Sequence, residues 1–144
     1  MMVMEYDGRI LVIDAGLSFP KDELLGIDLV IPDFAYLRER ADQIEAVLLT
    51  HGHEDHVGAL PFFLREINVP VYGTRLTLGL VKNKLEEHGL ADVVDLREIV
   101  ADQPRQIGPF HCDFISVTHS IPDGVALAIT TPVGTVVHTG DFKL

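Results

Sequence analysis

The 144-residue sequence contains a single cysteine and few basic residues. One cysteine, Cys112, excludes a disulfide within the chain and fits a reducing compartment. The sequence has 11 lysines and arginines and 22 aspartates and glutamates, so that the formal net charge is −11. Affinity for nucleic acids comes largely from basic side chains that neutralise phosphates. The composition therefore argues against this chain alone being a strong polyanion binder, without excluding catalysis on a phosphate.

Long hydrophobic runs are also missing. No apolar stretch reaches the roughly 18 residues of a membrane span, and residues 1–6 lack the basic and then apolar segments of a signal peptide. The sequence has no Gly-rich phosphate loop, and the serines near His119 do not suggest a nucleophilic triad. With 47% hydrophobic residues, we expect one globular domain with its own core, in the cytoplasm and without a membrane partner.

Hydrophobic periodicity predicts helices that alternate with strands, followed by consecutive strands. Strands are expected at 3–6, 9–13, 46–49, 69–72, 110–118, 125–130 and 135–138, with weaker candidates at 92–100 and 105–107. Helices are expected at 34–43, 57–67 and 74–88. In the last of these, Leu76, Leu80 and Leu85 should share the buried face, and Gly89 should end the helix. This order of elements indicates an α/β layered domain with mixed sheets.

Potential metal ligands are most concentrated directly after the apolar run 46–49. Residues 50–56 read Thr-His-Gly-His-Glu-Asp-His. Imidazoles and carboxylates are the usual protein ligands of zinc and similar divalent ions. In a tight turn, we expect His51 and His53 to point to one side and Asp55 and His56 to another. One short loop could then serve two ions roughly 3.5–4 Å apart, which is the arrangement of two-metal hydrolases.

Three further residues are candidates because they follow predicted strands. His119 comes after residues 115–118, and Asp141 after residues 136–138. Strand ends hold ligands rigidly, although each signal is weak by spacing alone. Asp14 ends the second strand, where its carboxylate could orient the histidine loop through hydrogen bonds or could simply cap a turn. His111 and His138 lie within strands and are expected to have packing or supporting roles.

Residues 51–61, His-Gly-His-Glu-Asp-His-Val-Gly-Ala-Leu-Pro, resemble the signature loop of the metallo-β-lactamase fold. The stretches 11–16, 118–123 and 138–143 agree with that family in order and spacing, so the resemblance covers the whole chain. The loop by itself is shared with β-lactamases, glyoxalase II and lactonases. The sequences Gly-Ala-Leu-Pro, His-Ser-Ile-Pro-Asp and His-Thr-Gly-Asp-Phe-Lys together resemble the ribonuclease J family, in the β-CASP branch of this fold.

The resemblance implies an αββα sandwich, of which residues 1–144 form the N-terminal half, and two bound zinc ions or manganese ions in their place. It implies six metal ligands: His51, His53 and His119 on one ion, Asp55 and His56 on the other, and Asp141 bridging them. Asp55, His56 and Asp141 are accordingly the expected catalytic residues, and Asp14 is expected to support the loop by hydrogen bonds.

The activity that the resemblance implies is hydrolysis of RNA phosphodiesters, both 5′–3′ exonucleolytic and endonucleolytic, by a hydroxide that two metal ions activate. Complete family members also have a β-CASP domain, a C-terminal domain, a Gly-rich first strand and a last histidine ligand, which residues 1–144 do not include. We therefore expect a catalytic domain truncated at both ends. The complete protein is expected to bind RNA and to form a homo-oligomer.

The sequence is compatible with two other functions. A different hydrolase of the same fold could act on a small ester or thioester, and a β-CASP-like insertion after residue 144 would argue against it. A non-enzymatic metal-binding module is the third alternative. It predicts no loss of any reaction rate when Asp55 is changed.

Overall fold

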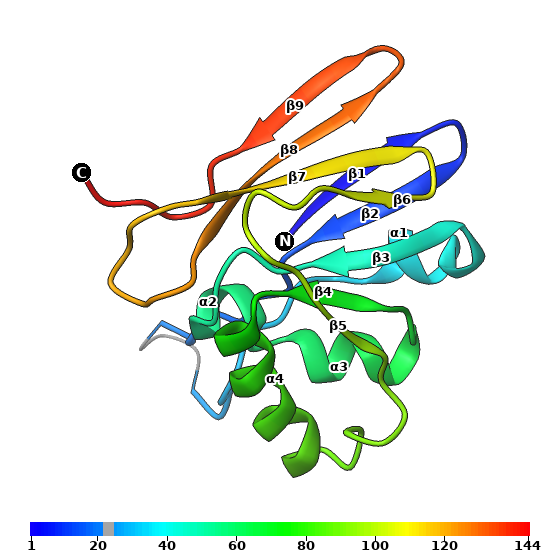
Figure 1. Ribbon diagram of the computed structural model, residues 1–144. Coiled ribbons are helices and arrows are strands. Elements are labelled where there is room, and N and C mark those ends of the chain that lie inside the picture. Colours follow the sequence, from blue (N-terminus) through cyan, green and yellow to red (C-terminus); the bar gives the residue numbers. More distant parts are fainter. Residues whose placement is uncertain (22–24) are drawn as a thin grey trace.

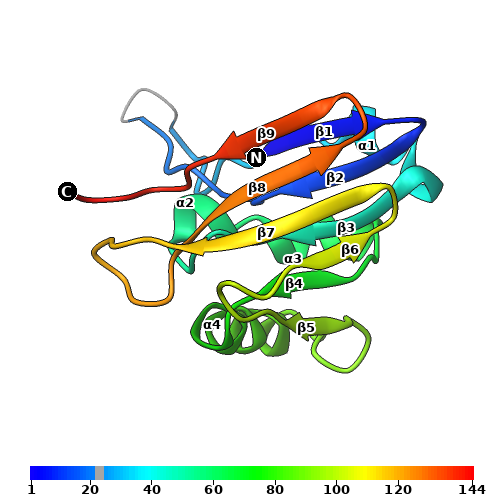
Figure 2. The same ribbon diagram turned by 45° about the horizontal axis from the view of Figure 1, so that its top comes forward.

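The computed structural model describes residues 1–21 and 25–144. The strands are β1 Met2–Tyr6, β2 Arg9–Ile13, β3 Ile44–Leu48, β4 Val71–Gly73, β5 Leu96–Glu98, β6 Arg105–Ile107, β7 Phe110–Ser116, β8 Val125–Thr131 and β9 Gly134–His138. The helices are α1 Ala35–Arg38, α2 Glu54–Val57, α3 Leu60–Glu66 and α4 Arg75–Glu87, with a 3₁₀ turn, η1, at Ala41–Gln43. These elements form a helix layer and two sheets (Figures 1 and 2), which confirms the expected mixed α/β architecture.

The first sheet has the order β1-β2-β3-β4-β5. Its antiparallel β1–β2 hairpin turns at Asp7 and Gly8, whose φ angles are 49° and 69°, as a two-residue turn of type I′ requires. From β2 to β5 the neighbouring strands are parallel, and Ile13 lies opposite Leu48. Parallel neighbours end at the same edge of a sheet. The residues that follow β2 and β3 are therefore brought together.

The core consists of two apolar layers, one on each face of the first sheet. On β2, Ile10 and Val12 face the layer shared with the helices, whereas Leu11 and Ile13 face the second sheet. Burial on both faces explains why this strand reads as a continuous apolar run. The second sheet, with the antiparallel order β6-β7-β8-β9, contributes Cys112 to the inner layer. That thiol is fully buried.

Two predicted helices are shorter or broken in the structure. The helix expected at 34–43 is reduced to α1 and η1. Leu37 is the one buried residue of α1, and Arg40 leaves helical geometry with φ −123° and ψ 25°. The helix expected at 57–67 begins earlier, at Glu54, and is interrupted between α2 and α3. At this interruption the N–H of Ala59 donates to the carbonyl of Ala15 at 2.8 Å, outside the helix.

The helix expected at 74–88 is present as α4, followed by Gly89 with φ 69°. Its buried face differs from the expected one and consists of Thr77, Leu78, Val81 and Leu85. Leu76 is exposed instead. Periodicity alone misplaced the face because apolar residues lie on both sides of this helix. No helix of the described residues is long and apolar enough to cross a membrane.

The outer face of the second sheet is open in the part of the chain that the structure describes. The helices lie beyond the first sheet, on the side away from β7, β8 and β9 (Figure 1). Accordingly, Ile115 and Val137 are exposed although both are large and apolar. Of the expected αββα sandwich, residues 1–21 and 25–144 form the α, β and β layers.

Candidate metal centre

The candidate ligands meet at one edge of the two sheets. Asp14 follows β2, and the segment beginning at His51 follows β3. His119 lies in the connection between β7 and β8, and Asp141 follows β9. The two sheets therefore contribute to one site, although its residues are separated by up to 127 positions of the sequence.

His51 lies at the centre of this site. It is fully buried, and its ring centroid lies 4.0 Å from that of His56, 4.8 Å from that of His53 and 4.9 Å from that of His119. Its Nε2 atom is buried without a hydrogen-bond partner. An unpartnered buried polar atom is costly, and this one lies among other potential ligands, as expected of a nitrogen that binds a metal.

The side chains form two potential ligand groups that share His51. In each group the ligand atoms lie within 4.8 Å of one another: His51, His53 and His119 in the first, and His51, His56 and Asp141 in the second. Asp141 Oδ2 is 3.3 Å from His56 Nε2, 3.9 Å from His51 Nε2 and 3.8 Å from His119 Nε2. The carboxylate of Asp141 thus lies between the two groups, where a bridging ligand is expected.

Asp55 is the one expected ligand outside both groups. Its side chain is 70% exposed, and its Oδ2 is 3.7 Å from His56 Nε2. His51 and His53 belong to one ligand group, as expected for the loop, but His51 also belongs to the group of His56. Asp55 and His56 project from α2, which begins at Glu54, rather than from a turn.

The carboxylate of Asp14 is held inside a network of hydrogen bonds. Its Oδ1 accepts from the backbone N–H of Thr50, and its Oδ2 accepts from Thr50 Oγ1 and from His56 Nδ1, each at 2.8 Å. Asp14 is buried. The carboxylate contacts a ring of the histidine loop directly, which is the contact that the predicted orienting role requires.

The pKa values of the two central imidazoles are shifted in opposite directions. Burial lowers the pKa of His51 to about 4, and the charge of the neighbouring His56 acts in the same direction. The hydrogen bond to Asp14 raises the pKa of His56, against the effect of its partial burial. His51 is consequently neutral at pH 7, and neutral imidazole is the form that binds metals.

Comparison with known proteins agrees with this geometry. Residues 1–144 match the family model of the metallo-β-lactamase superfamily. The chain belongs to the metallo-β-lactamase superfamily. The metallo-β-lactamase fold protein YhfI from Bacillus subtilis, 23% identical, superposes with a TM-score of 0.64 over 96% of this chain and 53% of its own. The expected fold is thereby confirmed.

Relatives at higher identity carry the name ribonuclease J. The protein from Helicobacter pylori is 49% identical over 145 residues, which is 100% of this chain and 21% of that protein. The protein from Thermus thermophilus is 50% identical over 149 residues, covering 99% of this chain and 26% of that protein. The similarity to ribonuclease J expected from the motifs is confirmed, and the chain spans about a fifth to a quarter of these relatives.

Two residues that support this metallo-β-lactamase site were missed from the sequence. Thr50 bonds both to Asp14 and to His51 Nδ1, and its only signal was its place between a buried strand and the first histidine. Gly16 lies so close to α2 that an added Cβ would be 1.6 Å from the backbone oxygen of Asp55. Nothing in the local pattern around Gly16 indicated that approach, because it depends on how the segment after β2 packs against α2.

The remaining histidines on strands lie outside the two ligand groups. His138 Nδ1 accepts a hydrogen bond of 3.1 Å from the N–H of Gly140, which shapes the turn that leads to Asp141. The ring of His111 is half exposed on β7, with its Nε2 3.6 Å from Asp113 Oδ2. Their expected packing or supporting roles agree with these positions.

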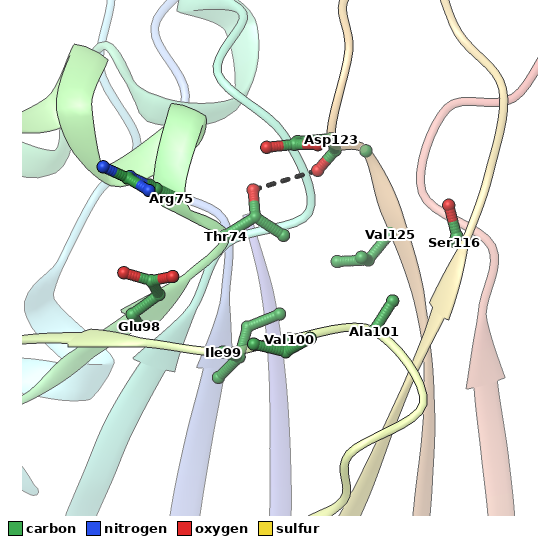
Figure 3. Close-up of a pocket in the computed structure, with 10 residues that line it drawn as sticks. Thr74, Arg75, Glu98, Ile99, Val100, Ala101, Ser116, Asp123 and Val125 are labelled. Carbon is green, nitrogen blue, oxygen red and sulfur yellow. Dashed lines mark hydrogen bonds between the residues drawn. The ribbon is translucent and has the colours of Figure 1, made fainter.

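A pocket of about 260 Å³ lies beside the site, between the start of α4 and the end of β7 (Figure 3). Thr74 closes one side by donating a hydrogen bond of 3.0 Å to the carbonyl of Asp123. The charged residues that line the pocket are Arg75, Glu98 and Asp123. One cation against two carboxylates does not favour a phosphate, and none of the clustered imidazoles lines this pocket.

Proposed function

We propose that this chain carries the metal centre of a ribonuclease that hydrolyses RNA phosphodiesters. The observation that carries the proposal is the pair of ligand groups that share His51 and have Asp141 between them. The identities of 49% and 50% to proteins named ribonuclease J support an RNA substrate over a small ester or thioester.

The side chains fit two divalent ions, with zinc or manganese as the proposed metals. Nitrogen and oxygen donors of this kind suit both ions. The Nε2 atom of His51 makes no hydrogen bond within the protein, which fits a nitrogen that binds a metal ion. The proposed assignment keeps the expected ligands: His51, His53 and His119 on one ion, Asp55 and His56 on the other, and Asp141 between them. When bound, such a pair supplies an activated water and stabilises charge that develops on phosphoryl oxygens.

The protein side chains have separate tasks in this proposal. His56, oriented by Asp14, and Asp55 hold the second ion from the start of α2. Asp141 supplies a negative charge between the two ligand groups, which keeps two dications close together at a tolerable electrostatic cost. Asp55, His56 and Asp141 are the proposed catalytic residues.

This chain has few of the basic residues that RNA binding requires. With 22 acidic and 11 basic residues, the chain by itself is expected to bind RNA weakly. Since it spans 21% to 26% of the ribonuclease J relatives, we propose that the RNA-binding surface, the β-CASP domain and the oligomer interface belong to the rest of such a protein. Exonuclease and endonuclease activities are likewise proposed for the whole protein, in the cytoplasm.

The test compares Asp55→Ala with Asp92→Ala, an exposed carboxylate far from the ligand groups in sequence, in the protein at its natural length. Hydrolysis of a 5′-monophosphorylated RNA should fall by several orders of magnitude in Asp55→Ala and stay unchanged in Asp92→Ala. Elemental analysis after dialysis should find about two metal ions per wild-type chain. Full activity of Asp55→Ala would contradict the ligand assignment, and cleavage of thioesters but not RNA would favour the other hydrolase class.

A further inference from the structure

Every polar group of Thr50 is engaged inside the metal site. Its N–H donates to Asp14 Oδ1 at 2.8 Å, and its carbonyl accepts from the N–H of Val125 at 2.9 Å. Its hydroxyl lies 2.8 Å from Asp14 Oδ2 and 3.0 Å from His51 Nδ1. The residue is 1% exposed. Thr50 therefore joins the ends of β2 and β3 to the start of β8.

The hydroxyl has one proton for its two near neighbours, Asp14 and His51, and His56 Nδ1 lies farther away at 3.5 Å. This fixes the direction of the two shorter bonds. The carboxylate of Asp14 can only accept, so Thr50 Oγ1 donates to Asp14 and accepts from His51 Nδ1–H. The reverse arrangement, in which Oγ1 donates to Nδ1, would place the ring proton on Nε2. That nitrogen is buried and makes no hydrogen bond, because the carboxylate oxygen Asp141 Oδ2, at 3.9 Å, lies beyond hydrogen-bond distance. Its N–H would therefore be left unsatisfied at a substantial free-energy cost.

We propose that Thr50 is a positioning residue, which holds His51 in the tautomer with its proton on Nδ1 and a bare Nε2 toward the ligand groups. His56 receives the same orientation directly, because its Nδ1 donates to the same Asp14 oxygen. The Asp14 carboxylate thus orients two imidazole rings. It bonds directly to His56 and acts on His51 through the Thr50 hydroxyl. The effect of Thr50 on metal affinity rests on the proposed function. The tautomer of His51 is argued from the hydrogen bonds alone and does not depend on that proposal.

The two ends of the Thr50 side chain have different neighbours, which allows them to be tested separately. The hydroxyl contacts Asp14 and His51. The methyl lies on the side of Gly140, where an added Cβ would be 3.6 Å from Thr50 Cγ2. Thr50→Val keeps the shape and removes the hydroxyl, whereas Thr50→Ser keeps the hydroxyl and removes the methyl.

The first measurement is the tautomer of His51 in the metal-free protein, from ¹⁵N NMR of the imidazole rings, in which protonated and bare nitrogens resonate far apart. Wild type and Thr50→Ser should carry the proton on Nδ1 of His51, and Thr50→Val should lose this preference. A proton on Nε2 in the wild type, or an unchanged tautomer in Thr50→Val, would overturn the proposal. If Thr50→Val does not fold, wild type and Thr50→Ser still decide it.

The second measurement is the affinity for Zn²⁺, by competition with a chromophoric chelator. Loss of a group that orients a ligand typically weakens metal binding by about 10–100-fold. We expect that loss in Thr50→Val and near-wild-type affinity in Thr50→Ser. Equal losses in both variants would show that packing, not the hydroxyl, matters. A wild-type chain that binds no Zn²⁺ would overturn the proposed function but not the tautomer assignment.

Discussion

His56 Nδ1 donates a hydrogen bond of 2.8 Å to Asp14 Oδ2, although the two residues are 42 positions apart. The contact exists because β2 and β3 are parallel neighbours and their ends coincide. Asp14 itself has a φ of 56°, a left-handed conformation that Asp and Asn tolerate better than other residues with a Cβ. The bond directs His56 Nε2 toward Asp141, whose Oδ2 is 3.3 Å away.

Asp14→Asn should therefore preserve the backbone and damage the metal site. All groups that bond to the Asp14 carboxylate donate, so an amide NH₂ would face a donor. We expect metal affinity to fall by about 10–100-fold and the free energy of unfolding by about 1–3 kcal/mol. Chelator competition and urea denaturation measure the two effects. Asp7→Asn is the matched control, since Asp7 is exposed with φ 49°. Equal behaviour of the two variants would refute the role of Asp14.

Gly16→Ala and Gly79→Ala should change stability in opposite directions. At Gly16 the new Cβ would lie 1.6 Å from the backbone oxygen of Asp55, so backbone must move, whereas at Gly79 nothing lies within 4 Å. We expect Gly16→Ala to cost about 3 kcal/mol or more and Gly79→Ala, inside α4, to stabilise by about 0.5–1 kcal/mol. Thermal and urea unfolding measure both. A stable Gly16→Ala variant with normal metal affinity would show that α2 does not need this close approach.

The structure was most predictable from the sequence where short-range patterns specify it, such as turn residues, apolar runs and clustered ligand side chains. The β1–β2 hairpin, β3 and the histidine cluster were predictable because Asp7-Gly8 specifies its turn and residues 46–49 are apolar throughout. His119 and Asp141 were weak candidates by spacing alone. Their proximity depends on the pairing of β8 with β7 and β9, and it was expected only through the family resemblance.

What the sequence could not show depends on long-range packing. The interruption between α2 and α3 follows from the bond between Ala59 N–H and the carbonyl of Ala15, which no local propensity encodes. The roles of Thr50 and Gly16 likewise arise from the meeting of β2 and β3. Threonine and glycine at strand ends are too common to be singled out without that contact.

Cys112 should act as a reporter of unfolding. It is fully buried in the layer between the sheets, and burial raises the pKa of its thiol from 9.0 to about 12. Because only the thiolate is nucleophilic, iodoacetamide at pH 8 should label the folded chain far more slowly than the urea-unfolded chain. The folded state favours the protonated thiol, so this residue's contribution to stability should be lost as the pH rises from about 9 toward 12. Rapid labelling of the folded protein, followed by mass spectrometry, would contradict this packing.

Self-association of this chain should depend on β9, which forms an edge of the second sheet. Val137 on this strand is 60% exposed, and an exposed apolar edge strand readily pairs with another chain. We expect concentration-dependent association in sedimentation velocity, and about tenfold weaker association in Val137→Lys, equivalent to about 1.4 kcal/mol. Val93→Lys is the control, since Val93 is 59% exposed outside the sheets. A wild-type chain that remains monomeric at every concentration, or equal effects of both lysines, would show that the β9 edge is not the contact.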